Sequence, residues 1–434
     1  MFKGPQQDNG GGRTAAKGGC VGMAGPPSTP GVPGTPSTPG TPSVLRAMND
    51  RAALDLLLEH GPLSRTRIGK LTGLSKPTAS QLLVRLETAG LVVATGTTEG
   101  RPGPNAQLYA VNPRAAYVAG LDVTPHRIRA AVADITGASA GEFELPTPGR
   151  RADSVVHQVT EALDGAVKAA GLVRSDVRRV VIGTPGAFDP GTGRLRYASH
   201  LPGWHSPTLL DDLAAALPMP VEYENDVNLA AVAEQRLGAA RGHQDFVLLW
   251  NHGGLGAALV IGGRLHRGWT GGAGEVGFMP VPGTPLVRRV TKANSGGFQE
   301  LAGGQAVPRL ARELGIAVPP GETYIDEAIA LLSEASRAAD GPYRDLLHAF
   351  ATGLATGLAA MVALLDPELV VLSGGVLVAG GEPLRALVQA ELAELAAPRP
   401  RLVIGSVRDE PVLRGALESA LATTRDEVFD TTSR

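Results

Sequence analysis

The sequence is poor in cysteine, in aromatic residues and in long apolar runs, and each shortage excludes a class of protein. Its single cysteine, Cys20, excludes an intrachain disulfide and a cysteine-based metal cluster. Phe, Trp and Tyr make up 4% of the 434 residues, so the cores must consist mainly of Leu, Val and Ala. The N-terminal region has no continuous apolar segment of the kind found in signal peptides. The longest apolar helix candidate, around Gly353 to Leu365, is shorter than the roughly 20 residues that cross a bilayer. We therefore expect a soluble, cytoplasmic protein that does not associate with a membrane.

The length and the uneven composition predict about three folded units behind a disordered tail. A chain of 434 residues exceeds one ordinary domain, and its hydrophobic fraction of 43% supports sizeable cores. Residues 1–43 are dominated by Gly, Pro, Ser and Thr, a composition that cannot bury enough apolar surface to offset the entropy lost on ordering. The formal net charge of −2 excludes a protein that coats polyanions through bulk charge.

The stretch from Leu74 to Val92 has the marks of a capped amphipathic helix. Ser75 is a favourable N-cap, Pro77 falls in the first turn where its missing N–H does no harm, and Gly90 is placed to end the helix. One stripe is apolar, with residues at i, i+3, i+4 and i+7: Ala79, Leu82, Leu83 and Leu86. The opposite side carries side chains that can donate to phosphates or reach base edges in a major groove: Lys76, Thr78, Ser80, Gln81 and Arg85.

Two further helices and a strand pair are predicted around this stretch. Asn49 to His60 is expected to form a first helix, and Ser64 is placed to cap a short second helix over residues 65–72. After Gly90, two strand-like runs flank a Gly/Pro-rich tip that carries Arg101. Three helices plus a β-hairpin describe a winged helix-turn-helix over residues 44–113, with Arg101 on the wing. Basic residues outnumber acidic ones in this segment, which favours DNA contact over the alternative of a helical adaptor that binds no nucleic acid.

Beyond Pro113 the pattern changes to alternating strands and helices, and it contains an internal repeat. Residues 117–123 and 127–135 predict two strands joined by a short turn, and residues 246–261 repeat this layout. Two α/β lobes that each open with a strand hairpin indicate a duplicated architecture with a ligand cleft between the lobes. We place the N-terminal lobe at 114–230, joined by the last helix at 411–424, and the C-terminal lobe at 231–410.

Six motifs together identify a family. The chain resembles the ROK family (repressors, open reading frames and sugar kinases) from Val44 to roughly Thr423, in LSKPTASQLLVRLETAGLV, GRPGPNAQLYAVNP, VIGTPGAFD, ENDVN, GGAGEVGF and DPELVVLSGGV. The resemblance implies an α/β fold, namely an N-terminal winged helix-turn-helix followed by a two-lobed actin-like or hexokinase-like domain. It also implies kinship with repressors that respond to xylose, glucose or N-acetylglucosamine derivatives.

The resemblance further implies a sugar site in the cleft. Asn225 and Asp226 match the family's Asn-Asp pair, whose aspartate takes a proton from the sugar in kinases and hydrogen-bonds the sugar in repressors. Glu275 and Glu300 match glutamates that meet sugar hydroxyls, and Gly186 matches the loop beside the sugar.

Alternative interpretations of this region stay open at the level of sequence. Asp226 and Asn228 could simply cap the helix that starts near Leu229. Trp204, in LPGWHSPTLL, resembles a loop near the sugar, but it could equally be a partly buried anchor.

Departures from the family pattern fall in the nucleotide turn and the zinc motif. The first phosphate turn, Asp122 to Arg127, lacks both family glycines, and Pro125 removes a backbone donor, so we expect no productive ATP binding. The family's zinc-binding histidine is replaced by Phe278, and its three cysteines by Thr291, Ala293 and Phe298. Zinc needs about four N or S ligands, which these positions do not supply, so we expect no metal and no cofactor.

These features predict a transcriptional regulator, most simply a repressor, with no enzymatic activity. It would bind a pseudo-palindromic operator as a homodimer or homotetramer and respond to a sugar or sugar phosphate in the cleft. Two alternatives come from other classes: an ATP-dependent sugar kinase with a regulatory DNA-binding head, and an effector-independent DNA-binding protein whose sugar site is vestigial.

Overall fold

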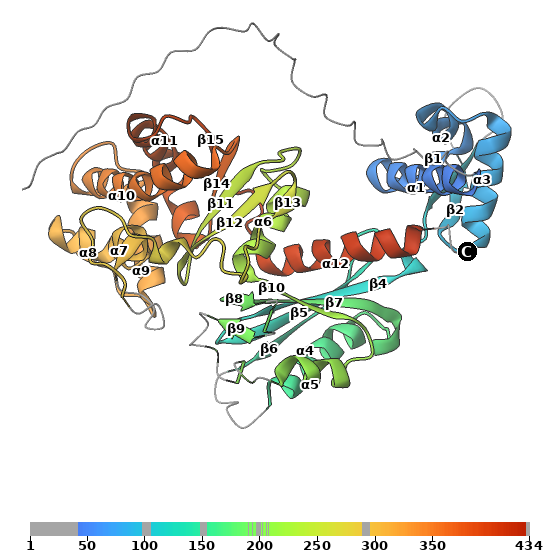
Figure 1. Cartoon of the computed structure of the whole chain (residues 1–434), viewed down its shortest axis with the longest axis horizontal. Helices are drawn as coiled ribbons and strands as arrows, with labels where there is room; N and C mark the ends of the chain where they lie inside the picture. Colours follow the sequence, from blue (N-terminus) through green and yellow to red (C-terminus); the bar gives the residue numbers. More distant parts are fainter. Residues whose placement is uncertain are drawn as a thin grey trace, which may run out of the picture.

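The structure, a computed structural model, places a small head beside two α/β lobes (Figure 1). It describes residues 42–97, 106–147, 154–189, 191–192, 194–196, 201, 203–204, 206, 208–288 and 296–430. The predicted tail, apart from its last two residues, and the wing tip with Arg101 lie outside these ranges, as do Thr291 and Ala293.

The head is a winged helix-turn-helix, as the sequence predicted. Its elements are α1 (Pro42–His60), β1 (Leu63–Ser64), α2 (Arg65–Thr72), α3 (Lys76–Thr88), β2 (Val92–Thr97) and β3 (Gln107–Val111). The strands form a small sheet in the order β1-β3-β2, with antiparallel neighbours. The first helix begins at Pro42, earlier than the predicted start at Asn49, and Ser64 caps α2 as expected.

The limits of α3 follow from the local sequence. Ser75 Oγ accepts a hydrogen bond from the Thr78 amide and so satisfies a free donor of the first turn. At the other end Gly90 takes a left-handed φ of +72°, and the amide of Leu91 donates to the Leu86 carbonyl at 2.8 Å. The predicted apolar stripe is at most 2% exposed at its four positions, Ala79, Leu82, Leu83 and Leu86. Its leucines pack against α1 and α2.

The N-terminal lobe is built on a five-stranded sheet in the order β10-β7-β4-β5-β6. Its strands are β4 (Tyr117–Val123), β5 (Arg127–Asp134), β6 (Ser139–Pro146), β7 (Val177–Thr184) and β10 (Val221–Asn225). One face carries α4 (Val155–Ala169) and α5 (Leu209–Ala216), and the other carries α6 (Asp226–Leu237) and α12 (Pro411–Phe429). A short ribbon, β8 (Ala187–Asp189) with β9 (Arg194–Arg196), and two 3-10 turns, Pro113–Ala115 and Arg174–Asp176, complete the lobe.

The C-terminal lobe repeats this plan with a second five-stranded sheet in the order β13-β12-β11-β14-β15. Its strands are β11 (Phe246–Asn251), β12 (Leu255–Ile261), β13 (Arg264–Leu265), β14 (Leu369–Ser373) and β15 (Arg401–Ile404). One face packs on α6, and the other on the 3-10 turn Val276–Phe278, α7 (Gly297–Ala302), α8 (Ala306–Glu313), α9 (Tyr324–Ala335), α10 (Pro342–Leu365) and α11 (Gly375–Leu395). The predicted α/β fold with two lobes is thus confirmed.

The long helix that the sequence predicts over Tyr343 to Leu365 is confirmed as α10. It has 24 residues, extends beyond the apolar run at Gly353 to Leu365 and is long and apolar enough to cross a bilayer, but its apolar side chains form the centre of the C-terminal lobe core. The sequence also predicts a strand over LVVLSGGV, and here the limits differ. The strand ends at Ser373, and α11 begins at once at Gly375, with a break at Gly381 (φ +56°) before Pro383. A fully buried apolar run before two glycines does not distinguish a strand end from a helix start.

The last helix connects the lobes to the head. It was expected to end near Thr423, but α12 continues to Phe429 and, in Figure 1, runs from between the lobes to the head. Val428 and Phe429 are buried in the apolar core of the head. Arg51 of α1 forms an ion pair with Asp426 at 2.8 Å and lies over the Phe429 ring. The head is therefore completed by a helix that begins in the lobes.

We predict that Phe429→Ala loosens the head from the lobes. Removing a fully buried ring leaves a cavity and costs about 3 kcal/mol or more. Amide hydrogen exchange in α1 should therefore accelerate, while exchange in β14 stays unchanged. Val173→Ala, at a position 62% exposed, serves as the control. Unchanged exchange in α1 would contradict the role assigned to Phe429.

Candidate functional site

A cleft of about 890 Å³ lies between the two lobes. The turn between β4 and β5, the junction of β10 with α6 and residues 185–186 line it from the N-terminal lobe. The turn between β11 and β12, residues 271–278 and residues 373–375 line it from the C-terminal lobe, and residues 407–412 add the start of α12. The strand ends of both sheets therefore face one cavity, the usual place for a ligand in α/β folds.

Asn225 builds the junction between β10 and α6. Its side-chain oxygen caps α6 by accepting from the Val227 and Asn228 amides, and its Nδ2 donates to the Gly186 carbonyl at 3.0 Å. Gly186 has a φ of +88°, which a residue with a Cβ adopts only with strain. The helix cap is thus Asn225, not Asp226 or Asn228, and it holds the Gly186 loop against the cleft.

Asp226 and Glu275 are the predicted sugar residues whose carboxylates line the cleft. Burial raises the pKa of Asp226 to about 7, the Val227 amide lowers it, and the charges of Asp122 and Glu275 raise it further. Burial likewise raises the pKa of Glu275 to about 7. Asp226 Oδ1 accepts from the Val227 amide. These carboxyls can therefore exchange hydrogen bonds with ligand hydroxyls.

Asp122 is a third cleft carboxyl, which the sequence marked only as the start of the degenerate phosphate turn. Burial raises its pKa to about 6, and the charges of Arg127 and Arg129 oppose that rise. Three carboxyls with raised pKa values thus share one cavity, an arrangement typical of functional sites.

Glu300 does not line the cleft. Its carboxylate accepts the Gly296 amide at 2.7 Å, at the start of α7. The neighbouring Gln299 lines the cleft instead, but its oxygen already accepts the Leu255 amide at 2.6 Å. Among the residues replacing the family's zinc ligands, Phe298 is fully buried in the C-terminal lobe core and Phe278 lines the cleft. The part of the chain that the structure describes contains no cluster of three or more His, Cys, Asp or Glu side chains suited to a metal ion.

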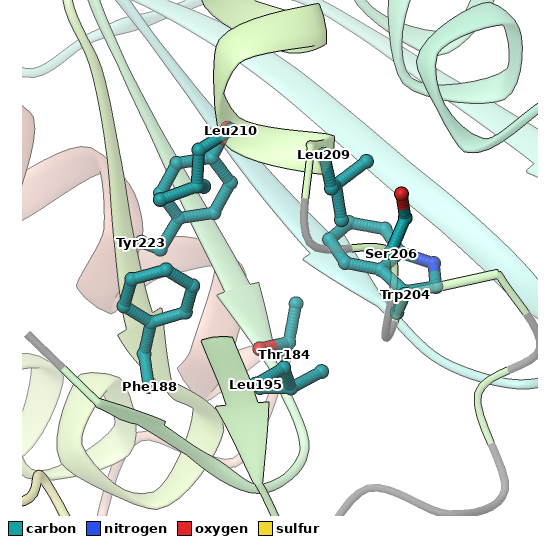
Figure 2. Close-up of a pocket in the computed structure, with 8 residues that line it drawn as sticks. All are labelled: Thr184, Phe188, Leu195, Trp204, Ser206, Leu209, Leu210 and Tyr223. Carbon is teal, nitrogen blue, oxygen red and sulfur yellow. The ribbon is translucent and has the colours of Figure 1, made fainter. Parts of the chain in front are cut away.

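Trp204 lies in a separate pocket of the N-terminal lobe. Figure 2 shows it beside Leu209, with Phe188 and Tyr223 on the opposite side of the pocket. The pocket measures about 10 Å³, room for one water molecule at most. Trp204 is 5% exposed and belongs to the lobe core. Of the two interpretations of Trp204, the structure favours the buried anchor.

The turn between β4 and β5 is closed by its own hydrogen bonds. The Thr124 amide donates to the Arg127 carbonyl at 2.9 Å, and the amides of His126 and Arg127 donate to Thr124 Oγ1. Pro125 has no amide hydrogen. All backbone donors of the turn are therefore occupied or missing, and none is free for a nucleotide phosphate.

The polar side of α3 carries some side chains that are exposed and some that already form hydrogen bonds within the head. Lys76, Thr78 and Gln81 are exposed, and the Thr78 hydroxyl lies 2.8 Å from Ser75 Oγ. Ser80 is half-buried, and its hydroxyl accepts from Arg65 of α2 at 3.3 Å and donates to the Lys76 carbonyl.

Arg85 has a structural partner that its position in the sequence did not reveal. Its guanidinium donates to Asp50 Oδ1 of α1 at 2.6 Å, and the Asp50 side chain is 5% exposed. Arg85 therefore links α3 to α1. Only the guanidinium N–H groups that do not bind Asp50 remain for contact with DNA. Arg65 is exposed beside Ser80 and is a further candidate for DNA contact. In the sequence it contributed only to the excess of basic over acidic residues in the head.

Comparisons with known proteins agree with this architecture. The ROK family profile matches residues 118–424, and the MarR family profile matches residues 49–101. The chain is 26% identical over 342 residues to a putative xylose repressor from Caldicellulosiruptor sp. (strain Rt8B.4), covering 76% of this chain and 84% of the relative.

Two solved structures share the fold. One is a ROK family transcriptional regulator described as a homologue of the E. coli MLC protein, with a TM-score of 0.66, 20% identity, and coverage of 89% of this chain and 98% of the other. The second is a ROK hexokinase from Thermus thermophilus, with a TM-score of 0.58, 30% identity, and coverage of 71% and 99%. The hexokinase chain is shorter, so this match covers nearly all of the hexokinase but only 71% of the present chain.

We predict that Asp226→Asn removes part of the pH dependence of stability. The native pKa of about 7 lies above the value near 4 of an unfolded aspartate, so the native state holds this proton more tightly. The stabilising contribution is full below about pH 4 and is lost as the pH rises through about 7.

The melting temperatures of wild type and variant should therefore diverge between pH 5 and pH 8, with the variant more stable at pH 8 by on the order of 2 kcal/mol. Asparagine keeps an oxygen for the Val227 amide, so the comparison is matched. Asp340→Asn, at an exposed position, is the control. Parallel pH curves for wild type and Asp226→Asn would rule out a buried, proton-binding Asp226.

Proposed function

Since this chain belongs to the ROK family and its head matches the MarR family, we propose that it is a sequence-specific transcriptional regulator. It acts in the cytoplasm as a repressor, and a sugar or sugar derivative in the cleft controls its affinity for operator DNA. The observation that carries this proposal is α12, because one continuous helix starts in the wall of the cleft and ends in the core of the head.

The head supplies the DNA contacts. Lys76 and Gln81, exposed on α3, enter the major groove, with Thr78, Ser80 and Arg65 at its edges. Arg85 positions α3 through Asp50, and Arg101 on the wing meets the DNA backbone or minor groove. Two heads of a symmetric homodimer, or of each half of a homotetramer, read a pseudo-palindromic operator whose half-sites lie about 34 Å or a multiple apart.

A ligand bound in the cleft controls the affinity of the head for DNA. Asp226 and Glu275 bind the hydroxyls of the ligand, while Asn225 and Gly186 hold the loop beside it. A ligand that contacts both lobes favours one angle between them. Because Pro411 and Val412 line the cleft and Phe429 is buried in the head, a change at the start of α12 shifts the head. The distance between two DNA-binding heads then no longer matches the operator.

A sugar kinase is the second candidate, favoured by one observation. Asp226 keeps the position and the raised pKa that suit a general base toward a sugar hydroxyl. The closed turn at Thr124 to Arg127 opposes this candidate, because it offers no backbone donors to the nucleotide phosphates. Transfer of phosphate from ATP to any hexose by the purified protein would establish the kinase and refute our preference.

The proposed function is tested by operator binding with and without sugars. We expect the purified protein to bind its own promoter region, and one sugar or sugar phosphate to release it. Fluorescence anisotropy of a labelled promoter fragment measures both steps. Binding that no ligand alters would favour an effector-independent DNA-binding protein, and absence of binding would refute the proposal.

We predict that Lys76→Ala and Gln81→Ala weaken operator binding without lowering the melting temperature, because both side chains are exposed. Gln81→Ala should cost about 1–3 kcal/mol on the operator and little on random DNA, if it reaches a base edge. Lys76→Ala should weaken both and reduce the slope of log affinity against log salt by about 1. Arg241→Gln, an exposed charge outside the head, is the control. Equal losses on operator and random DNA for Gln81→Ala would assign that residue to the backbone.

A further inference from the structure

Val84 is a branched apolar side chain on the outward face of α3, where it is 62% exposed. Successive residues of an α-helix are turned by about 100°, so Val84 lies about 160° around the helix from Leu86 and about 140° from Ala79. Leu86 and Ala79 belong to the buried stripe of α3. Val84 therefore points almost directly away from the core of the head.

The position of Val84, and not its exposure alone, distinguishes it from other apolar surface residues. Single exposed apolar side chains are common on protein surfaces, and Val173 in the N-terminal lobe has the same exposed fraction. Val84, however, shares its face of α3 with Gln81, which is exposed and lies three residues earlier, about 60° around the helix. Pro77, seven residues before Val84 and also exposed, extends this face. The centre of the surface that we assign to DNA is therefore partly apolar.

The hydroxyl groups of α3 are already hydrogen-bonded within the head. Thr78 Oγ1 lies 2.8 Å from the hydroxyl of the N-cap residue, and Ser80 Oγ donates to a carbonyl one turn earlier at 2.9 Å. Thr88 Oγ1 donates to the backbone carbonyl of Val84 at 2.7 Å. Gln81 and Val84 are therefore the side chains at the centre of this face whose end groups remain for distinguishing one base from another.

Thymine carries the group that is complementary to a valine side chain. Its C5-methyl is the methyl group that the major groove presents, and apolar side chains recognise it by contact. Valine strongly prefers one χ1 rotamer in a helix, so little side-chain entropy is lost when its methyl groups are covered. A guanine or cytosine edge against Val84 would instead lose water from its donors or acceptors without gaining a partner, which is unfavourable.

We propose that Val84 is a specificity-determining residue, which packs against the C5-methyl group of one thymine in each operator half-site. This assignment rests on the proposed function, in which α3 enters the major groove. Val84 follows Gln81 by three residues, or about 4.5 Å along the helix, which is on the order of the step of about 3.4 Å between base pairs. The thymine therefore lies one base pair away from the base that Gln81 contacts.

The test replaces thymine by deoxyuridine, which removes the C5-methyl group and leaves the hydrogen-bonding edge of the base unchanged. The probe is the fragment of the protein's own promoter that the full chain binds, prepared with one thymine replaced at a time. Fluorescence anisotropy gives the affinity for each fragment. For the wild type we expect one thymine in each half-site whose replacement weakens binding about fourfold, the effect of uncovering one methyl group. Replacement of thymines outside the half-sites should have no effect.

The variant Val84→Ala separates this contact from a general loss of binding. It should bind the unmodified fragment about fourfold or more weakly, and replacing the sensitive thymine should then weaken binding by less than about 1.5-fold, because the methyl group has lost its partner. The melting temperature should not fall, since the site is exposed and alanine has the higher helix propensity. Val173→Ala, equally exposed but outside the head, should behave as wild type. Lys76→Ala should weaken binding to all fragments equally, as expected for a phosphate contact.

Three results would overturn the role of Val84. They are a wild type that is insensitive to deoxyuridine at every thymine, an unchanged operator affinity in Val84→Ala, and a sensitive thymine that stays equally sensitive in Val84→Ala. A protein that binds its promoter but gives any of these results loses only the role of Val84. A protein that binds no promoter fragment loses the proposed function and this role together.

Discussion

The close packing of α12 against α6 and the N-terminal sheet is the constraint on which the rest of the structure depends. Gly415 brings α12 so near to α6 that a Cβ there would lie 1.9 Å from the Leu229 carbonyl oxygen. Gly120 of β4 and Gly183 of β7 leave room for the same helix on the strand side. Further along, Arg179 of β7 donates to Glu427 of α12. These contacts hold α12 against α6 and the strands of the N-terminal lobe along its length. Its last residues are buried in the core of the head, so one packed helix joins the wall of the cleft to the head.

The cleft is lined by two kinds of ionisable side chain, buried carboxyls and guanidinium groups. Burial favours the neutral forms of Asp226 and Glu275 near pH 7, so they can both donate to and accept from hydroxyls. Arg127, Arg129 and Arg408 line the same cavity and add guanidinium groups to it. Burial raises the pKa of Asp122, and the charges of Arg127 and Arg129 lower it.

Sequence predicted what depends on neighbours along the chain and missed what depends on distant ones. The caps at Ser64 and Ser75 and the apolar stripe of α3 follow from spacing alone, and all were confirmed. The pairing of Arg85 with Asp50 joins residues 35 positions apart and leaves no local pattern. Phe429 in the head's core and Arg408 on the cleft edge likewise follow from tertiary packing. The motif that contains Glu300 fixed its place in the sequence, but the fold of α7 turned its carboxylate to the Gly296 amide.

The turn between β4 and β5 differs in its backbone donors from a turn that binds nucleotide phosphates. A kinase needs free backbone amides at this point, and it needs flexible glycines to present them to a nucleotide. Here Thr124 uses its hydroxyl to occupy the amides of His126 and Arg127, and Pro125 removes the remaining one. The turn therefore has no backbone donor left for a nucleotide phosphate, and this is the feature that favours a regulator over a kinase in our proposal.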